Sequence, residues 1–240
     1  MTPAEAIVEC LKDFGHNRPN SDWSELDSDT ERLIRGNPFA LLLAVAFDRG
    51  MPWQKAWQIP AEIHQKGVLD PKLLSSQSEA ELVELLNSLP FLPRYGAQQG
   101  ARTLSEAARL VCERFDGDAG AIWKNAAPAE VEKILQEIHG IGAGIASMTT
   151  RILHEDFDCF QGQERQIDVK PDSLLLRVFR RAGLIDKESE DQARRAARRL
   201  NPEFPAALDW PAWRIAQDWC HPKKPECATC PLTGVCTKRI

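Results

Sequence analysis

Four cysteines lie close together near the end of the chain, and their spacing constrains the fold more than any other feature. They are Cys220, Cys227, Cys230 and Cys236, in the pattern C-x6-C-x2-C-x5-C. Four thiolates so spaced bind an iron-sulfur cube or a zinc ion. Structural zinc sites usually join two close pairs across a longer gap, whereas these ligands follow at uneven short intervals. The run therefore favours a [4Fe-4S] cluster, with zinc as the alternative.

The length and composition indicate a folded protein with two interlocked lobes. The chain has 240 residues, which exceeds one typical domain, and 43% of them are hydrophobic and 27% charged. The start, Met-Thr-Pro-Ala-Glu, lacks the basic and apolar segments of a secretory signal, and no apolar run reaches the length of a membrane span. We expect a cytoplasmic monomer with no membrane partner and with free thiols.

Helical patterns run through nearly the whole chain, which predicts an all-α fold. Thr2-Pro3-Ala4-Glu5 is a capping box with proline in the first turn, and Gly15 is the predicted end of that helix. Asn37-Pro38 precedes a segment that is apolar on almost every face, which predicts a buried central helix. Ser78 and Glu81 form a second capping box. Further helices are expected near 53–66, 78–88, 97–115, 128–138, 143–154, 173–182, 187–199 and 211–219.

A glycine-rich turn, Gly140-Ile141-Gly142-Ala143-Gly144, separates two of these predicted helices. Glycines allow a tight turn and leave amide N–H groups accessible. Beside the N-terminus of the second helix, such amides can hold a phosphate directly or through a bound monovalent cation. A plain packing corner between two helices would have the same sequence.

Asp172 stands at the start of the helix predicted at 173–182 and is the candidate catalytic acid. A helix N-terminus favours an ionised carboxylate, which could stabilise a cationic sugar or orient a water molecule. The alternative is an ordinary N-cap. Lys170, two residues earlier, could bind phosphate or supply an amine.

The net charge of −5 argues against a nucleic-acid ligand unless the basic residues gather locally. Lys223 and Lys224 lie in the first cysteine loop, where they could contact a phosphate backbone or balance the charge of a cluster. Seven arginines could form a further basic face, or they could pair with acids on a solvated helix surface. They are Arg177, Arg180, Arg181, Arg194, Arg195, Arg198 and Arg199.

The glycine turn, the Pro-Asp-Ser-Leu-Leu-Leu-Arg-Val segment and the cysteine run, in that order, resemble the endonuclease III branch of the helix-hairpin-helix base-excision glycosylases. The likeness covers roughly residues 30 to 238. It implies a six-helix barrel domain with the hairpin at 37–165 and an iron-sulfur cluster domain from 1–36 and 166–240. It also implies a DNA cleft between them, a flipped damaged base and Asp172 as the catalytic aspartate.

The chain departs from this family at several positions. Bifunctional members carry a Schiff-base lysine where this chain has Gly144. We therefore expect a monofunctional glycosylase that uses water as its nucleophile. Adenine-mispair members have a glutamate where Ala44 stands, which disfavours that substrate. Arg49 or Met51 replaces the glutamine that fills the gap left by the flipped base.

Phe47, Trp53 and Trp57 lie near the pocket wall that the resemblance implies, where they could stack on a flipped or alkylated base. Core packing is the alternative for each ring. The partner that these features imply is double-stranded DNA with a damaged base. Two other hypotheses are a catalytically silent iron-sulfur protein that recognises distorted or branched DNA, and a zinc-stapled interaction domain.

Overall fold

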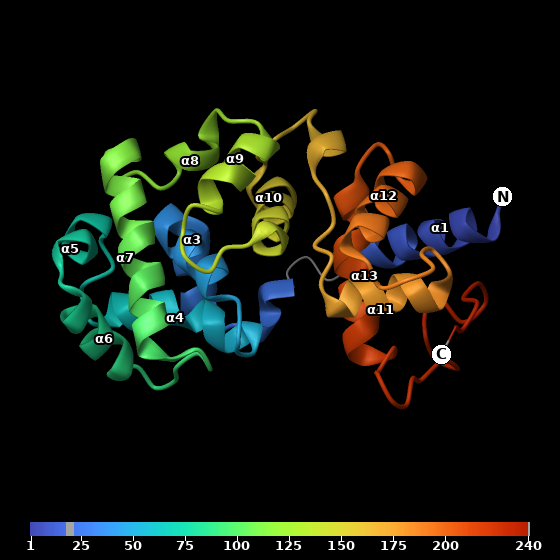
Figure 1. The fold of residues 1–240 in the computed structure, drawn as a ribbon, viewed down its shortest axis with the longest axis horizontal. Coiled ribbons are helices and arrows are strands. Elements are labelled where there is room, and N and C mark those ends of the chain that lie inside the picture. The colour runs from blue at the N-terminus through green and yellow to red at the C-terminus, as the bar shows by residue number, and fades with distance from the viewer. Residues whose placement is uncertain (18–21, 240) are drawn as a thin grey trace. The chain divides into compact units, whose positions relative to one another are not determined.

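The computed structural model describes residues 1–17 and 22–239 and confirms the all-helical prediction, with no strand in these ranges. Within them, none of the helices combines the length and the apolar character that a membrane span requires. The α-helices are α1 (Pro3–His16), α2 (Ser28–Gly36), α3 (Pro38–Phe47), α4 (Trp53–Gln65), α5 (Pro71–Ser76), α6 (Glu79–Asn87), α7 (Gly96–Phe115), α8 (Ala121–Lys124), α9 (Pro128–Leu135), α10 (Ala143–Phe157), α11 (Ser173–Ala182), α12 (Glu190–Leu200) and α13 (Asp209–Asp218) (Figure 1). Short 3-10 helices are η1 (Asp22–Glu25), η2 (Glu164–Gln166) and η3 (Pro205–Leu208).

The predicted capping signals start the helices as expected. Both capping boxes are formed, by Thr2 with Glu5 at α1 and by Ser78 with Glu81 at α6. Asn37 accepts hydrogen bonds from two backbone amides of α3, with proline at the first helical position. The predicted end of α1 at Gly15 is wrong, because α1 continues to His16. Glycine tolerates helical geometry, and the Asn17 N–H closes the helix by donating to Asp13 O at 3.2 Å.

Two compact units make up the chain: Ser21–Thr149 forms one, and Met1–Asn20 with Thr150–Ile240 forms the other. In the first unit, α3 is the central helix, and every residue from Phe39 to Phe47 is buried. It packs against α2, α4 and α7, while α5 and α6 pack along α7 (Figure 1). The predicted buried helix is therefore confirmed.

The second unit is built from α1, α11, α12 and α13, which pack around a separate apolar core. Helix α11 contacts α13, and α1 contacts both α13 and η3. Leu11 and Leu175 are fully buried there, and Leu232 brings the C-terminal cysteine segment onto the same core. This unit thus supports Asp172 on one helix and the cysteine run behind it.

The bounds of the packed units differ from the lobe bounds expected from the sequence. Residues of α2 belong with the hairpin-containing unit because α2 packs on α3 and α4. The other bound falls inside α10, between Thr149 and Thr150, rather than at 165. The assignment of 37–165 and of 1–36 with 166–240 to functional domains stays a prediction.

Candidate functional site

The predicted site residues divide between the two units. The unit Ser21–Thr149 carries the glycine turn, Arg49 and the aromatic residues. The unit that begins again at Thr150 carries Lys170, Asp172, the loop lysines and the cysteines. Within each unit, the packing decides which of these residues lie together.

Asp172 caps α11 and keeps part of its carboxylate accessible. Its Oδ1 accepts hydrogen bonds from the backbone N–H groups of Leu174 at 2.9 Å and Leu175 at 3.0 Å. Its Oδ2 lies 3.8 Å from Lys170 Nζ, and its side chain is 29% exposed. One oxygen is therefore fixed by the helix, while the other faces an amine at a partly open position. The N-cap interpretation is confirmed, and it leaves the second oxygen available for chemistry.

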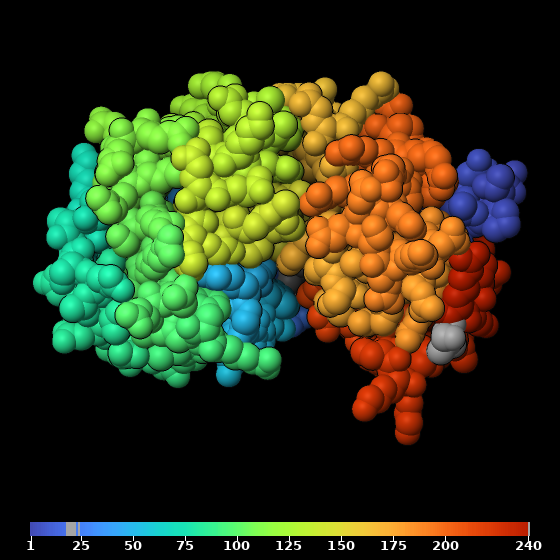
Figure 2. Space-filling model, in the orientation of Figure 1, coloured from blue at the N-terminus to red at the C-terminus, as the bar shows by residue number. Residues whose placement is uncertain are grey.

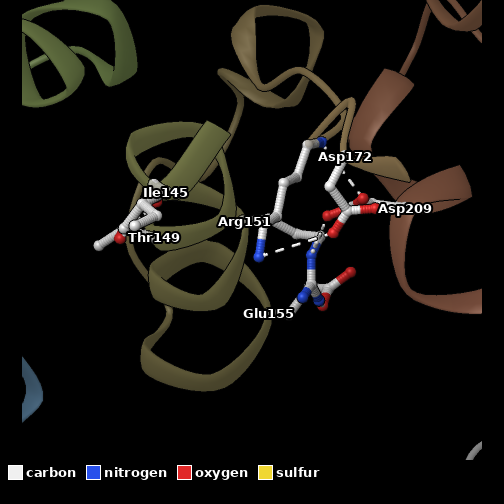
Figure 3. Close-up of polar contacts among 7 residues, drawn as sticks. Ile145, Thr149, Arg151, Glu155, Asp172 and Asp209 are labelled. Atoms are coloured by element: carbon white, nitrogen blue, oxygen red, sulfur yellow. Dashed lines mark hydrogen bonds and ion pairs between the residues drawn. The ribbon is translucent and has the colours of Figure 1, made fainter. Parts of the chain in front are cut away.

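A buried ion pair that no local pattern predicted lies behind Asp172. Arg151 Nε on α10 donates to Asp209 Oδ2 on α13 at 3.0 Å, and Arg151 also pairs with Glu155 at 2.5 Å (Figure 3). The backbone N–H of Lys170 donates to Asp209 Oδ1 at 3.2 Å. Arg151 and Asp209 thus tie α10 and α13 to the segment that leads into Asp172.

The electrostatics of this pair follow from its burial. Burial raises the pKa of Asp209 to about 6, although Arg151 acts to lower it, and the neighbouring Asp172 raises it further. Burial alone would lower the pKa of Arg151, but Glu155 and Asp209 outweigh that effect and raise it. Arg151 therefore stays charged, whereas Asp209 can gain a proton at mildly acidic pH.

The glycine turn connects α9 to α10 as predicted. Gly140 has a φ of +92°, which favours glycine over other residues. Ile141 is buried and anchors the turn, while Gly142 is exposed. Gly144 lies in the first turn of α10. The turn therefore presents backbone at the surface, as either a phosphate-binding hairpin or a packing corner requires.

Arg49 lies against this turn. A Cβ at Gly140 would fall 2.0 Å from the Arg49 guanidinium carbon, so any other residue there would require the Arg49 side chain to move. Arg49 Nη2 donates to Thr103 Oγ1 at 2.8 Å, and Thr103 Oγ1 donates to His139 O at 2.9 Å. The guanidinium also stacks 4.1 Å from the Tyr95 ring centroid. One of the two residues predicted to fill the gap left by a flipped base, Arg49, is thus held on the hairpin.

The three predicted pocket aromatics differ in exposure. Phe47 is fully buried at the end of α3, and Trp57 is 4% exposed. Trp57 packs edge-on against Trp53 and Trp23, and its Nε1 lies 3.4 Å from Asp48 Oδ2. Phe47 and Trp57 have the surroundings of core residues, which is the alternative that the sequence left open. Trp53 is half-buried.

The four cysteines of the C-terminal run line one pocket, together with Val178, Ile215 and Trp219. Among the described residues, no three Cys, His, Asp or Glu side chains are arranged to hold a single metal ion. Thiolates on one zinc ion lie roughly 3.8 Å apart, since Zn–S bonds are about 2.3 Å. A cube binds each thiolate through a separate iron atom and so sets the thiolates further apart. Four thiols lining one pocket are the donor set that an iron-sulfur cube would use.

Arg177 and Arg181 of α11 hold the first cysteine loop in place. Arg177 Nε donates to Cys220 O at 2.7 Å. Arg181 donates to His221 O at 2.7 Å and lies 3.5 Å from Cys220 Sγ. Two arginines expected on a DNA-binding face therefore stabilise the cysteine loop. Their spacing of four residues on a helix before a cysteine run is the only signal that could have suggested this role.

The remaining basic residues separate into paired and exposed groups. Arg195 pairs with Asp191, and Arg198 pairs with Asp168, as the solvated-surface alternative expected. The loop lysines, Lys223 and Lys224, are exposed. They belong to the C-terminal segment, drawn in red, which stands out from the surface in Figure 2.

Comparison with known proteins confirms the resemblance that the motifs indicated. Endonuclease III homolog 2, chloroplastic, from Arabidopsis thaliana is 25% identical over 182 residues. The match covers 72% of this chain and 41% of that protein, so the chain spans less than half the length of this relative. No family model matches the chain.

Solved structures show the same fold. Endonuclease III in a trapped covalent intermediate with DNA matches with a TM-score of 0.69 at 17% identity, over 99% of this chain and 97% of that one. A non-covalent endonuclease III–DNA complex matches with a TM-score of 0.68 at 16% identity, over 99% and 97%. A thermostable thymine-DNA glycosylase matches with a TM-score of 0.67 at 16% identity, over 98% and 96%. The chain has the endonuclease III fold.

Proposed function

We propose that this chain is a DNA glycosylase of base excision repair that hydrolyses the N-glycosidic bond of a flipped, damaged base. The observation that carries the proposal is the arrangement at Asp172. One carboxylate oxygen is fixed by two helix amides, and the other lies 3.8 Å from Lys170 Nζ on a side chain that is 29% exposed. The fold and the relatives' names support the same activity.

The geometry suggests how Asp172 acts. Two backbone amides at the start of α11 hold Oδ1 of Asp172 in place. Loss of a base leaves positive charge on the sugar, which a fixed carboxylate stabilises without rearranging. The outward oxygen can also orient the attacking water and accept its proton. Such a positioned carboxylate contributes about 10² to 10⁴ in rate.

The proposed reaction is monofunctional. Gly144 offers no amine where bifunctional members of the family carry their lysine. Lys170 is the amine nearest to Asp172 in the described contacts, and its Nζ is held at 3.8 Å from that carboxylate. An ammonium paired with a carboxylate is a poor nucleophile, because it must lose its proton first. Borohydride trapping of a DNA adduct that disappears in Lys170→Ala would contradict this part of the proposal.

The cysteine pocket would hold a [4Fe-4S] cluster on Cys220, Cys227, Cys230 and Cys236. When bound, such a cluster cross-links the C-terminal segment and supplies a one-electron redox centre. The chain's own contribution is the frame: Arg181 fixes the loop carbonyls, and Val178, Ile215 and Trp219 shield the pocket from water. This frame also presents Lys223 and Lys224 for contact with phosphates.

Double-stranded DNA with a damaged base is the proposed partner of the monomeric protein. The hairpin amides near Gly140 and Gly142 would bind phosphate, directly or through a monovalent cation. The half-buried Trp53 is the ring best placed by its exposure to meet a base. An alkylated purine would suit such a ring, because a cationic base stacks well on an aromatic face.

The test is base release from a panel of duplexes, each carrying one lesion. The lesions are uracil, thymine opposite guanine, hypoxanthine, 7-methylguanine and thymine glycol. After incubation, alkali breaks any abasic site, and parallel samples without alkali report strand cleavage by the protein. We expect strand breaks only after alkali, with wild type and not with Asp172→Asn. Release from none of the duplexes, by a brown protein that still binds DNA, would favour the catalytically silent reader of distorted DNA.

A further inference from the structure

The segment that delivers Asp172 is tied to a charged pair in the protein interior. Lys170 bridges the two acids of this corner: its backbone N–H donates to Asp209 Oδ1 at 3.2 Å, and its Nζ lies 3.8 Å from Asp172 Oδ2. Asp209 Oδ2 in turn accepts from Arg151 Nε at 3.0 Å. Figure 3 shows Arg151, Glu155 and Asp209 converging on the side of the site where Asp172 lies.

Folding stability alone does not explain why an ion pair is buried at this position. The side chains of Arg151 and Asp209 are 10% and 6% exposed. Removing two charges from water often costs more than their attraction returns, and an apolar pair would fill the space at less cost. What an apolar pair cannot do is accept the N–H of Lys170 or place a fixed negative charge behind Asp172.

We propose that Asp209, held by Arg151, is a positioning residue for Asp172. It sets the backbone at Lys170 and thereby the direction in which the outward oxygen of Asp172 points. This role rests on the proposed glycosylase function of the site. Asp209 is too buried to touch DNA, so it acts through the Lys170–Asp172 segment and not on the substrate.

The charges around Asp209 explain why its ionised form matters. Arg151 and Lys170 face it as cations, and Asp172 faces it as a like charge. An ionised Asp209 repels the Asp172 carboxylate and attracts the Lys170 N–H dipole, so both effects hold the two acids apart across Lys170. Protonated Asp209 loses the repulsion and attracts the Lys170 N–H more weakly. Glu155 faces Arg151 from the same helix and keeps Arg151 charged in either state.

Three variants separate this role from general stability. Asp209→Asn keeps an oxygen that can accept the Lys170 N–H but removes the charge. Asp209→Ala removes both. Arg151→Met combined with Asp209→Asn removes both charges of the pair, and Glu155, whose side chain is 17% exposed, is the acid that loses Arg151 as its partner. The matched control is Asp168→Asn. Asp168 lies on the same segment, two residues before Lys170, and the change removes its ion pair with Arg198.

The kinetic measurement is the single-turnover rate on the duplex of the lesion panel that wild type cleaves fastest. Affinity for a duplex with a tetrahydrofuran abasic site is measured beside it. We expect the rate to fall about tenfold in Asp209→Asn and about a hundredfold in Asp209→Ala, since small misplacements cost this much. Affinity should change less than about twofold, and Asp168→Asn should match wild type in both. The wild-type rate should also fall below a pH of about 6, but not that of Asp209→Asn.

A second measurement does not depend on activity. Native-state hydrogen exchange of the Lys170 amide should be slow in wild type and Asp168→Asn, and fast in Asp209→Ala. If wild type releases no base from any duplex, the proposed function fails, and the amide exchange alone then decides the positioning role. Wild-type rates in the folded double variant, or unchanged Lys170 protection in Asp209→Ala, would overturn the inference.

Discussion

Two arginines lie beside the two predicted functional corners, and their surroundings differ. Arg151, behind Asp172, is held between Glu155 and Asp209. Arg49, on the hairpin turn, contacts Gly140 and the Tyr95 ring, and its Nε finds no hydrogen-bond partner among the described residues. His139 Nε2 on the same turn is also buried without a partner in that part of the chain.

The Asp172 corner therefore has its polar groups satisfied, whereas the hairpin corner keeps buried polar atoms that can still form hydrogen bonds. Buried polar atoms almost always find a partner, so the free atoms of the hairpin are suited to a water molecule or a ligand. The Asp172 corner holds its charged groups in ion pairs and hydrogen bonds within the chain.

Asp172→Asn should lower the rate of base release about a thousandfold, or about 4 kcal/mol in the activation free energy. Asparagine caps a helix about as well as aspartate, so the melting temperature should change little. Single-turnover kinetics and thermal unfolding of the same preparation check both parts. A variant that unfolds early would show that Asp172 is mainly a structural cap.

The buried charge at the Asp172 corner should reduce folding stability at neutral pH. The folded pKa of Asp209, about 6, is above the ordinary value of 3.8. Its contribution to stability is therefore fully present below pH 3.8 and is lost as the pH rises through about 6. We expect the unfolding free energy of wild type, relative to Asp209→Asn, to fall by on the order of 3 kcal/mol between pH 4 and pH 7.

Urea unfolding of both proteins across this pH range measures the difference, and the subtraction removes the effects of other groups that the two share. A difference that stays constant with pH would mean that Asp209 keeps an ordinary pKa in the folded protein. The buried charge would then cost no folding stability at neutral pH, and the contrast between the Asp172 corner and the hairpin would weaken.

Gly140→Ala should disturb the hairpin, because the new Cβ would meet the Arg49 guanidinium at 2.0 Å and the φ of +92° disfavours alanine. We expect a loss of about 1 to 3 kcal/mol in stability. Gly142→Ala is the matched control, since no atom of the described residues lies within 4 Å of its Cβ position. Adding Arg49→Ala to Gly140→Ala should recover part of the loss in denaturant unfolding. No recovery would place the strain in the backbone alone.

Lys223→Ala with Lys224→Ala should give the smallest effect, on DNA binding alone. Two lost phosphate contacts would reduce the magnitude of the negative slope of log affinity against log salt concentration by about 2. Fluorescence anisotropy of a labelled duplex over a range of salt concentrations measures the slope. Arg195→Ala is the control, because its guanidinium already pairs with Asp191. An unchanged slope in the lysine variant would indicate that these lysines only balance the charge of the cysteine site.

Local signals in the sequence predicted much of the fold. Capping residues such as Thr2, Asn37 and Ser78 act within one helical turn, so their effect is readable without tertiary structure. Helices α2, α5 and α8 were missed. Six residues in α5 and four in α8 give too few turns for a clear apolar period, and α2 consists mostly of charged and polar residues.

The candidate site could be predicted only in part, because some of its contacts join distant segments or involve backbone groups. Asp172 and the cysteines belong to compact motifs. Arg151 and Asp209 are 58 residues apart, and nothing near either one signals the other. Arg181 was assigned to a basic surface because its partners are backbone carbonyls, which every sequence contains. Contacts between distant segments, and contacts to backbone, remained outside what the pattern could predict.

The burial of α3 from Phe39 to Phe47 has a consequence for how the chain reaches its folded state. During synthesis, Pro38–Phe47 leaves the ribosome well before α7 at Gly96–Phe115, one of the helices that cover it. Until then, a ten-residue apolar segment has no charged residue to keep it in water. Exposed segments of this kind drive aggregation. The protein should therefore depend on chaperones during translation more than its content of charged residues suggests.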